Sequence, residues 1–130
     1  MLGRRRTAFA GVMLAAAVLV TALAIAATGS AKGGQKLSLK ASASGALKFN
    51  KKTLSAKPGK ATIVMTNPSG SGLKHGVEVE GKGIEKRTKN VGPGKTTRVT
   101  VTLKAGKYDF YCPVDGHKAA GMKGTIVVKK

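Results

Sequence analysis

RVTVTLKAGKYDFYCPVDGHKAAGM, residues Arg98–Met122, joins two alternating apolar patterns to a polar loop. In Arg98–Leu103 valine and leucine alternate with threonine, and in Lys107–Cys112 the alternate positions are Tyr, Phe and Cys. Alternation with a period of two predicts β-strands that bury one face, and the Ala-Gly pair between the two patterns predicts a turn. The second strand would therefore carry Cys112 on its buried face, at the very end of the strand.

The same alternation recurs along the chain from about residue 47 onward. The further candidate strands lie between turn motifs such as Pro-Gly and Gly-Pro-Gly, and they are Leu47–Asn50, Ala61–Thr66, Leu73–Gly81 and Lys123–Lys129. No stretch after residue 31 shows the apolar period of a helix. Short strands with turns every 8 to 12 residues or so, roughly the spacing seen here, predict an all-β fold, either a β-sandwich or a small barrel.

The first 31 residues have a different composition from the rest. Arginines occupy positions 4–6, and Ala8–Ala27 then contains no charged residue. This pattern is typical of an export segment, and we expect residues 1–31 to be a signal peptide cleaved after Ala26 or Ala31, or a retained N-terminal membrane anchor. Either alternative predicts an exported domain, which would be periplasmic, extracellular or anchored outside the cytoplasm.

The remaining chain suits one small domain. Residues 32–45 are rich in Lys, Gly, Ser and Ala, a composition that predicts a flexible basic arm, with Leu37 and Leu39 as the hint of a short strand. Residues 46–130 then form the single domain. We expect it to be a monomer.

Positive charge dominates the surface that this sequence can form. The net charge is +19, and it stays at about +16 when the three arginines of the export segment are removed. The scarcity of aromatic residues, the lack of a basic helical face and the export segment all argue against nucleic acid. The field should instead attract an acidic redox protein, or associate the protein with a membrane or cell-wall polymer.

Four side chains form a candidate metal site. His117 follows the only cysteine, Cys112, by five residues, Met122 follows by five more, and His75 is the only other histidine. A thiolate, two imidazoles and a thioether are the ligands of a blue mononuclear copper site. Zinc would accept the first three but prefers a harder fourth ligand. Taken singly, each residue has a plainer interpretation, a buried thiol, a strand histidine or a core methionine.

The sequence also resembles the cupredoxin family of blue copper proteins, the relatives of plastocyanin, azurin, rusticyanin and auracyanin. The likeness runs from about Leu47 to Val128, and its motifs are an Asn-Pro turn before HGVEVEG, then GPGKTTRVTVTL, GKYDFYC and a Cys-x4-His-x4-Met loop ending in AGMKG. It implies a Greek-key β-sandwich and one type 1 copper ion. The equatorial ligands would be His75, Cys112 and His117, and the axial ligand Met122.

Two further positions take their meaning from this resemblance. Tyr108 would be the tyrosine that pins a Greek-key corner. Gly76 departs from the family pattern, because many relatives have an asparagine there that ties two loops together.

The function that these features predict is one-electron transfer without substrate turnover. With two histidines and one cysteine, the chain lacks the ligands for a multicopper or binuclear copper centre, so we expect no enzyme. Scavenging or delivery of copper by the same ligands is the alternative. A metal-free basic adhesion module is the third hypothesis.

Overall fold

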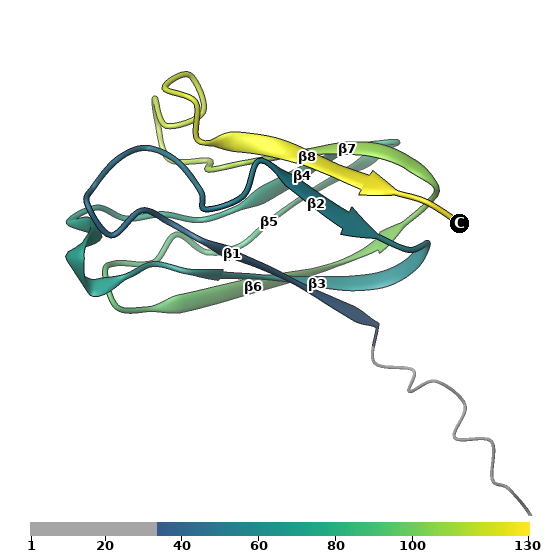
Figure 1. Cartoon of the computed structure of the whole chain (residues 1–130), viewed down its shortest axis with the longest axis horizontal. Helices are drawn as coiled ribbons and strands as arrows, with labels where there is room; N and C mark the ends of the chain where they lie inside the picture. Colours follow the sequence, from purple (N-terminus) through teal and green to yellow (C-terminus); the bar gives the residue numbers. More distant parts are fainter. Residues whose placement is uncertain (1–33) are drawn as a thin grey trace, which may run out of the picture.

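The computed structural model describes residues 34–130, which form a sandwich of two β-sheets (Figure 1). The smaller sheet has the strand order β1-β3-β6, with bounds β1 Gln35–Lys40, β3 Gly59–Thr66 and β6 Thr96–Leu103. The larger sheet has the order β2-β8-β7-β4-β5, with bounds β2 Thr53–Ala56, β8 Lys123–Val128, β7 Gly106–Tyr111, β4 Glu78–Gly81 and β5 Ile84–Arg87. A single 3-10 turn, η1 (Ser69–Ser71), follows β3. The predicted all-β sandwich is confirmed.

The core lies between the two sheets and follows the alternation in the sequence. In β3, the side chains of Ala61, Ile63 and Met65 are fully buried, while the residues between them are partly exposed. The larger sheet faces them with residues that are also fully buried, Val79, Phe110 and Ile126. Burying a side chain of this size stabilises the fold by roughly 1.5–3 kcal/mol. A shift of the strand register by one residue would expose these side chains, so their burial fixes the register.

The predicted boundaries need three corrections. The flexible arm expected over residues 32–45 is wrong for its described part, because β1 pairs in parallel with β3 and buries Leu37 and Leu39. The strand expected at Leu47–Asn50 is absent: Phe49 is buried, but it makes only an isolated bridge to Ala41. The expected strand at Leu73–Gly81 is shortened to β4.

The export segment expected at residues 1–31 lies outside the described residues. Between residues 34 and 130, no helix is both long and apolar enough to cross a membrane.

The strands place all the long connections at one end of the sandwich. The connections are residues 41–52, 67–77, 88–95 and 112–122, and we call this the site end. The opposite end, the far end, carries the tight turns at 57–58, 82–83 and 104–105 and the C-terminus. In Figure 1 the site end is on the left, and the C-terminus and the start of β1 are on the right.

Tyr108 closes the corner between the two sheets at the far end. Its ring is 1% exposed, and its hydroxyl accepts a hydrogen bond from the backbone N–H of Lys104 at 2.9 Å. This bond ties the start of β7 to the end of β6, as the resemblance to a corner tyrosine implies.

Candidate metal centre

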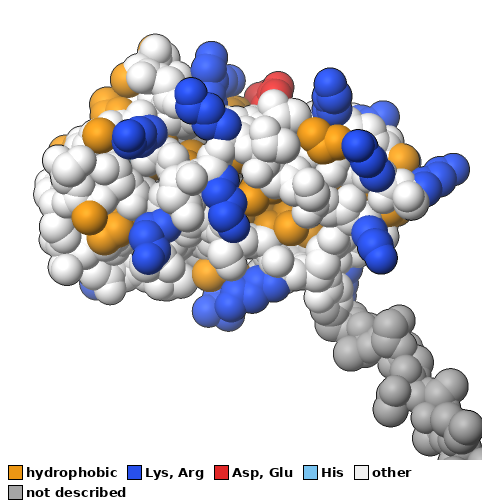
Figure 2. All heavy atoms as spheres, viewed as in Figure 1, with side chains coloured by type: hydrophobic (Ala, Val, Ile, Leu, Met, Phe, Trp, Pro, Cys, Tyr) orange, Lys and Arg blue, Asp and Glu red, His pale blue; other side chains and the backbone are white. Residues whose placement is uncertain are grey.

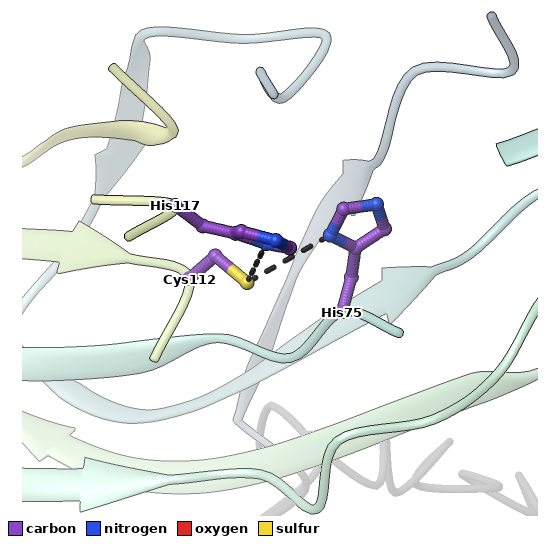
Figure 3. A group of neighbouring side chains, drawn as sticks. All are labelled: His75, Cys112 and His117. Atoms are coloured by element: carbon purple, nitrogen blue, oxygen red, sulfur yellow. Dashed lines mark hydrogen bonds between the residues drawn. The ribbon is translucent and has the colours of Figure 1, made fainter. Parts of the chain in front are cut away.

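Three of the four predicted site residues meet at the site end (Figure 3). The Cys112 sulfur lies 3.5 Å from Nδ1 of His117 and 3.8 Å from Nδ1 of His75. The two imidazole rings have centroids 5.1 Å apart. All three donor atoms lie within 4.8 Å of one another, so one ion could contact all of them.

The distances fit a bound metal better than a set of ordinary hydrogen bonds. Metal–donor bonds of about 2.0–2.3 Å, at angles between tetrahedral and trigonal, separate a nitrogen and a sulfur ligand by roughly 3.5–3.8 Å. Both measured separations from the sulfur fall in this range. Figure 3 shows the sulfur pointing between the two rings, which come from separate segments of the chain.

Cys112 and His117 are fixed by the loop that follows β7. The backbone N–H of Cys112 donates to the carbonyl of Met122 at 3.0 Å, which closes the base of the loop. The N–H of His117 donates to the carbonyl of Val114 at 3.0 Å, and the N–H of Met122 donates to the carbonyl of His117, also at 3.0 Å. Because Gly116 has φ 79°, the loop can turn back and carry the imidazole over the sulfur.

His75 is held by the chain on the opposite side of the site. Its N–H donates to the carbonyl of Val91 at 3.0 Å, and the N–H of Val91 donates back at 2.8 Å. The histidine also precedes β4, and β4 pairs with β7 in antiparallel register. Since β7 ends at Cys112, this pairing brings two residues far apart in the sequence to the same place.

Asn67 braces the histidine segment, and the sequence analysis missed its role. The side chain is fully buried, and its Nδ2 donates to the carbonyls of Leu73 and Val91, each at 2.8 Å. Its Oδ1 accepts a hydrogen bond from the hydroxyl of Ser71. The signal was present as the Asn-Pro turn, but only the pairing with Val91 shows which loops it joins.

Gly76 is compensated by residues from the neighbouring loop. A Cβ at position 76 would lie 2.3 Å from Oδ1 of Asn90 and 3.0 Å from Oγ1 of Thr88, so these side chains fill the space beside the glycine. The Thr88 hydroxyl also accepts a hydrogen bond from the N–H of Val77 at 3.1 Å and donates to the carbonyl of Lys89 at 2.9 Å. The loops are therefore joined without an asparagine at position 76.

The pKa shifts of His75 and Cys112 bear on how these two donors would bind a metal cation. Burial, and then the charge of His117, lowers the pKa of His75, so its imidazole stays neutral and available as a ligand. Burial raises the pKa of the Cys112 thiol, although hydrogen bonds from the backbone N–H groups of Gly76 and Val114 oppose the shift. A metal ion would supply the positive charge that favours the thiolate.

Two further observations concern how His75 and Met122 are placed for metal binding. Nε2 of His75 is buried and has no hydrogen-bond partner, so the ring is positioned by its Nδ1 side and by packing. Met122 is fully buried, and its backbone is bonded to both Cys112 and His117. The thioether residue therefore belongs to the same closed loop as the other donors.

The sequence model for copper binding proteins of the plastocyanin/azurin family matches residues 36–129. The chain therefore belongs to this family, and copper is the metal that its buried His-Cys-His cluster serves. The fold and the donors agree with that membership, because thiolate and imidazole ligands suit copper.

Among similar proteins is "Plastocyanin, chloroplastic" of Chlamydomonas reinhardtii, which is 34% identical over 95 residues. The match covers 66% of this chain and 61% of the relative, so the chain spans less than two thirds of the relative's length.

Two solved structures share the fold. Auracyanin B has a TM-score of 0.67 at 22% identity, covering 75% of this chain and 91% of auracyanin B. Auracyanin A, a "blue" copper protein of Chloroflexus aurantiacus, has a TM-score of 0.64 at 22% identity, covering 75% of this chain and all of auracyanin A (100%).

Proposed function

We propose that the protein is an exported carrier of single electrons that works through one type 1 copper ion. The observation that carries the proposal is the convergence of two imidazoles and one thiol, all buried, at one end of a β-sandwich. Bound copper supplies the one-electron redox chemistry. The two sheets and the hydrogen-bonded loops hold the donors in place, which limits the rearrangement that each electron transfer requires.

The ligand assignment is part of the proposal. His75 and His117 would bind through Nδ1, because these are the atoms that face the Cys112 sulfur. Met122 would supply the weak axial contact from the base of the loop. Hydrogen bonds from the backbone N–H groups of Gly76 and Val114 to the sulfur would tune the electron density on the thiolate.

Electrons would pass through the edge of His117. His117 is 7% exposed, whereas His75 and Cys112 are completely buried. Around it lie the partly or fully exposed small apolar residues Pro113, Val114, Ala119 and Ala120. Leu73, at 41%, is the exposed large hydrophobic residue of the described chain, and it lies two positions from His75. A small apolar surface of this kind suits brief, weak docking to an acidic redox protein.

The burial of the donors favours a carrier over a protein that delivers copper. Delivery requires the ion to leave, and of the three donor residues only His117 is exposed at all, at 7%. We therefore expect fast electron self-exchange and slow loss of copper to a chelator at neutral pH. Slow self-exchange together with rapid copper loss would instead establish delivery.

A copper titration of the wild type and the variant Cys112→Ser tests the site. We expect one equivalent of copper(II) to give an intense blue absorption in the wild type, and we expect Cys112→Ser to lose it, because the colour requires the thiolate. A blue Ser variant would contradict the assignment. Met122→Leu is the matched control: it keeps nearly the same volume and the thiolate, so it should stay blue with a shifted reduction potential.

A further inference from the structure

The far end of the sandwich carries a lysine in every turn. The exposed residues Lys57, Lys82 and Lys104 occupy the turns β2–β3, β4–β5 and β6–β7. The chain then ends at this same end with Lys129 and Lys130, both exposed. These five lysines define what we call the lysine end. Figure 2 shows blue side chains around the right-hand end of the molecule, whereas the left-hand tip is mainly white and orange.

A hollow at the lysine end is lined by three lysines together with apolar residues. It has a volume of about 270 Å³ and opens between β5 and β6. Its lining consists of Lys82, Lys86, Lys104, Ile84, Val101, Thr102 and Tyr108. The stem of Lys82 lies directly over Gly106, where a Cβ would meet it at 2.2 Å from Cε. Like charges gathered in this way repel one another, so the arrangement suits an anionic ligand better than an empty surface.

Three acidic residues of this sheet lie near the lysine end but face away from the hollow. Glu80 pairs directly with Glu85 on one side and with Asp109 on the other, so the three form one row across β5, β4 and β7. Glu85 alternates with Ile84 and Lys86, and therefore points to the face of β5 opposite the hollow. The hollow and the acidic row thus lie on opposite faces of β5, although the row is only one residue pair from the β4–β5 turn.

The described chain also begins at the lysine end. Gly34 lies against the backbone of Lys60, next to the turn that carries Lys57. The preceding sequence includes the uncharged stretch Ala8–Ala27, which is long enough to span a bilayer. A chain held by such a stretch would present the lysine end to the lipid surface first.

We propose that the lysine end is a docking surface for anionic lipid headgroups. The turn lysines would contact the headgroup phosphates, and the hollow between β5 and β6 would accept one phosphate with its glycerol carbons against the apolar residues of the lining. The copper site would then point away from the membrane, because it lies at the opposite end of the strands. This inference does not depend on whether the copper ion carries electrons.

The test compares two triple variants of the full chain on vesicles. Lys57→Gln/Lys82→Gln/Lys104→Gln removes the turn lysines, and Lys48→Gln/Lys74→Gln/Lys95→Gln removes the same charge from exposed positions at the site end. Binding is measured by sedimentation with vesicles of phosphatidylcholine alone and with added phosphatidylglycerol. The ratio of the two affinities isolates the electrostatic contribution, since an uncharged segment partitions into both kinds of vesicle.

We expect this ratio to fall on the order of a hundredfold in the first variant, at roughly fivefold per lysine near the surface. The site-end variant should retain most of the wild-type ratio. Equal losses in both variants would overturn the proposal, because they would indicate a response to net charge alone. Binding of the same variants to soluble polyphosphate is measured in parallel. If the turn-lysine variant lost affinity for polyphosphate but not for the vesicles, the proposal would be overturned in favour of a wall polymer.

Acylation of individual lysines, read by mass spectrometry, gives an independent measure of orientation. On phosphatidylglycerol vesicles, the turn lysines should be protected severalfold, while Lys74 and Lys95 should react as they do in solution. Uniform protection, or protection of the site end, would contradict the proposed orientation.

Discussion

The two donors with shifted pKa values respond to burial in opposite directions. Without metal, the fold favours a neutral imidazole at His75 and a protonated thiol at Cys112. Neither group carries a charge in the core, so the sandwich can form before the ion arrives. Binding copper then replaces the thiol proton, which couples metal affinity to pH.

These shifts predict how the stability of the metal-free protein depends on pH. Because the pKa of His75 is lowered, the unfolded state binds more protons below about pH 6.5, and the free energy of unfolding falls as pH drops through the folded pKa. The raised pKa of Cys112 has the mirror effect: the unfolded thiol ionises first, so stability also falls as pH rises above 9.0. Urea unfolding between pH 4 and 10, roughly, measures both limbs.

Cys112→Ser is the control for the alkaline limb. A serine hydroxyl does not titrate in this range, so the decline above pH 9.0 should become shallower while the acid limb remains. An unchanged alkaline limb would assign that decline to other groups.

We predict that substitution of Asn67 strongly lowers the free energy of unfolding, although Asn67 is not one of the metal donors. Asn67→Asp keeps the shape but removes two donors and turns a carboxylate toward the carbonyls of Leu73 and Val91. Leaving buried polar groups unpaired costs about 1–3 kcal/mol, and more for a charge. We expect the metal-free protein to lose about 3 kcal/mol at neutral pH, measured by urea unfolding. The exposed neighbour Asn90→Asp is the matched control and should change stability little.

At the level of the element, β8 is shaped by one glycine. A Cβ at Gly124 would lie 2.3 Å from the Phe110 ring and 2.4 Å from the backbone oxygen of Lys52. The ring packs at 5.7 Å, centroid to centroid, against that of Phe49 and has little space to move. The glycine therefore allows β8 to fit between β2 and β7.

We predict that Gly124→Ala destabilises the fold by about 2–4 kcal/mol, because neither the backbone oxygen nor the packed ring can yield cheaply. Gly92→Ala is the matched control: nothing lies within 4 Å of the added Cβ, and its effect should be within about 0.5 kcal/mol. Thermal unfolding of both variants provides the measurement. Equal destabilisation would mean that β8 shifts to accept the methyl group.

The elements that could be predicted are those with a clear period of two. β3, β6, β7 and β8 each have six or eight residues with apolar side chains at alternate positions, and the pattern predicts all four close to their observed bounds. β2 and β5 were missed because each has four residues, too few to establish a period. They are the two edge strands of the larger sheet, so each is determined by pairing with a single neighbour, β8 for β2 and β4 for β5.

Only part of the candidate site could likewise be predicted from the sequence. The period of two correctly placed Cys112 on a buried face, whereas His75 is buried although it precedes β4 and only forms an isolated bridge to Val91. Burial alone does not bring two side chains together. The two donors are 37 positions apart in the sequence, and the antiparallel pairing of β4 with β7 brings them together. Local sequence cannot specify such a pairing, whereas the Cys-to-Met loop is local and could be anticipated.

At the scale of the whole molecule, the copper donors and the turn lysines lie at opposite ends, while exposed lysines also surround the site end. The copper donors lie at the site end, under a small apolar surface, and the turn lysines lie at the far end. Because the two ends are opposite, a partner could dock at the site end while the far end faces an anionic surface. The net charge of +19 nevertheless produces a field that reaches both ends.

That field predicts the salt dependence of electron transfer. With an anionic oxidant such as hexacyanoferrate(III), the rate should fall as ionic strength rises from about 0.01 to 0.5 M, because the Debye length shrinks from about 30 Å to a few ångströms. With a cationic oxidant such as a cobalt(III) tris-phenanthroline complex, the rate should instead rise, because salt screens the repulsion. Both reactions start from the reduced, colourless copper(I) protein, and stopped-flow spectroscopy follows the appearance of the blue copper(II) absorption as each oxidant takes one electron.

The variant Lys74→Gln/Lys95→Gln separates local charge from net charge. It removes two lysines near the site end, while Lys57→Gln/Lys104→Gln removes the same charge from the far end. If electrons pass through His117, the first variant should slow the anionic reaction severalfold at low salt, and the second should change it much less, because screened interactions weaken with distance. Equal effects of the two variants would mean that the reagent responds to total charge, and would remove the argument for the His117 edge as the route.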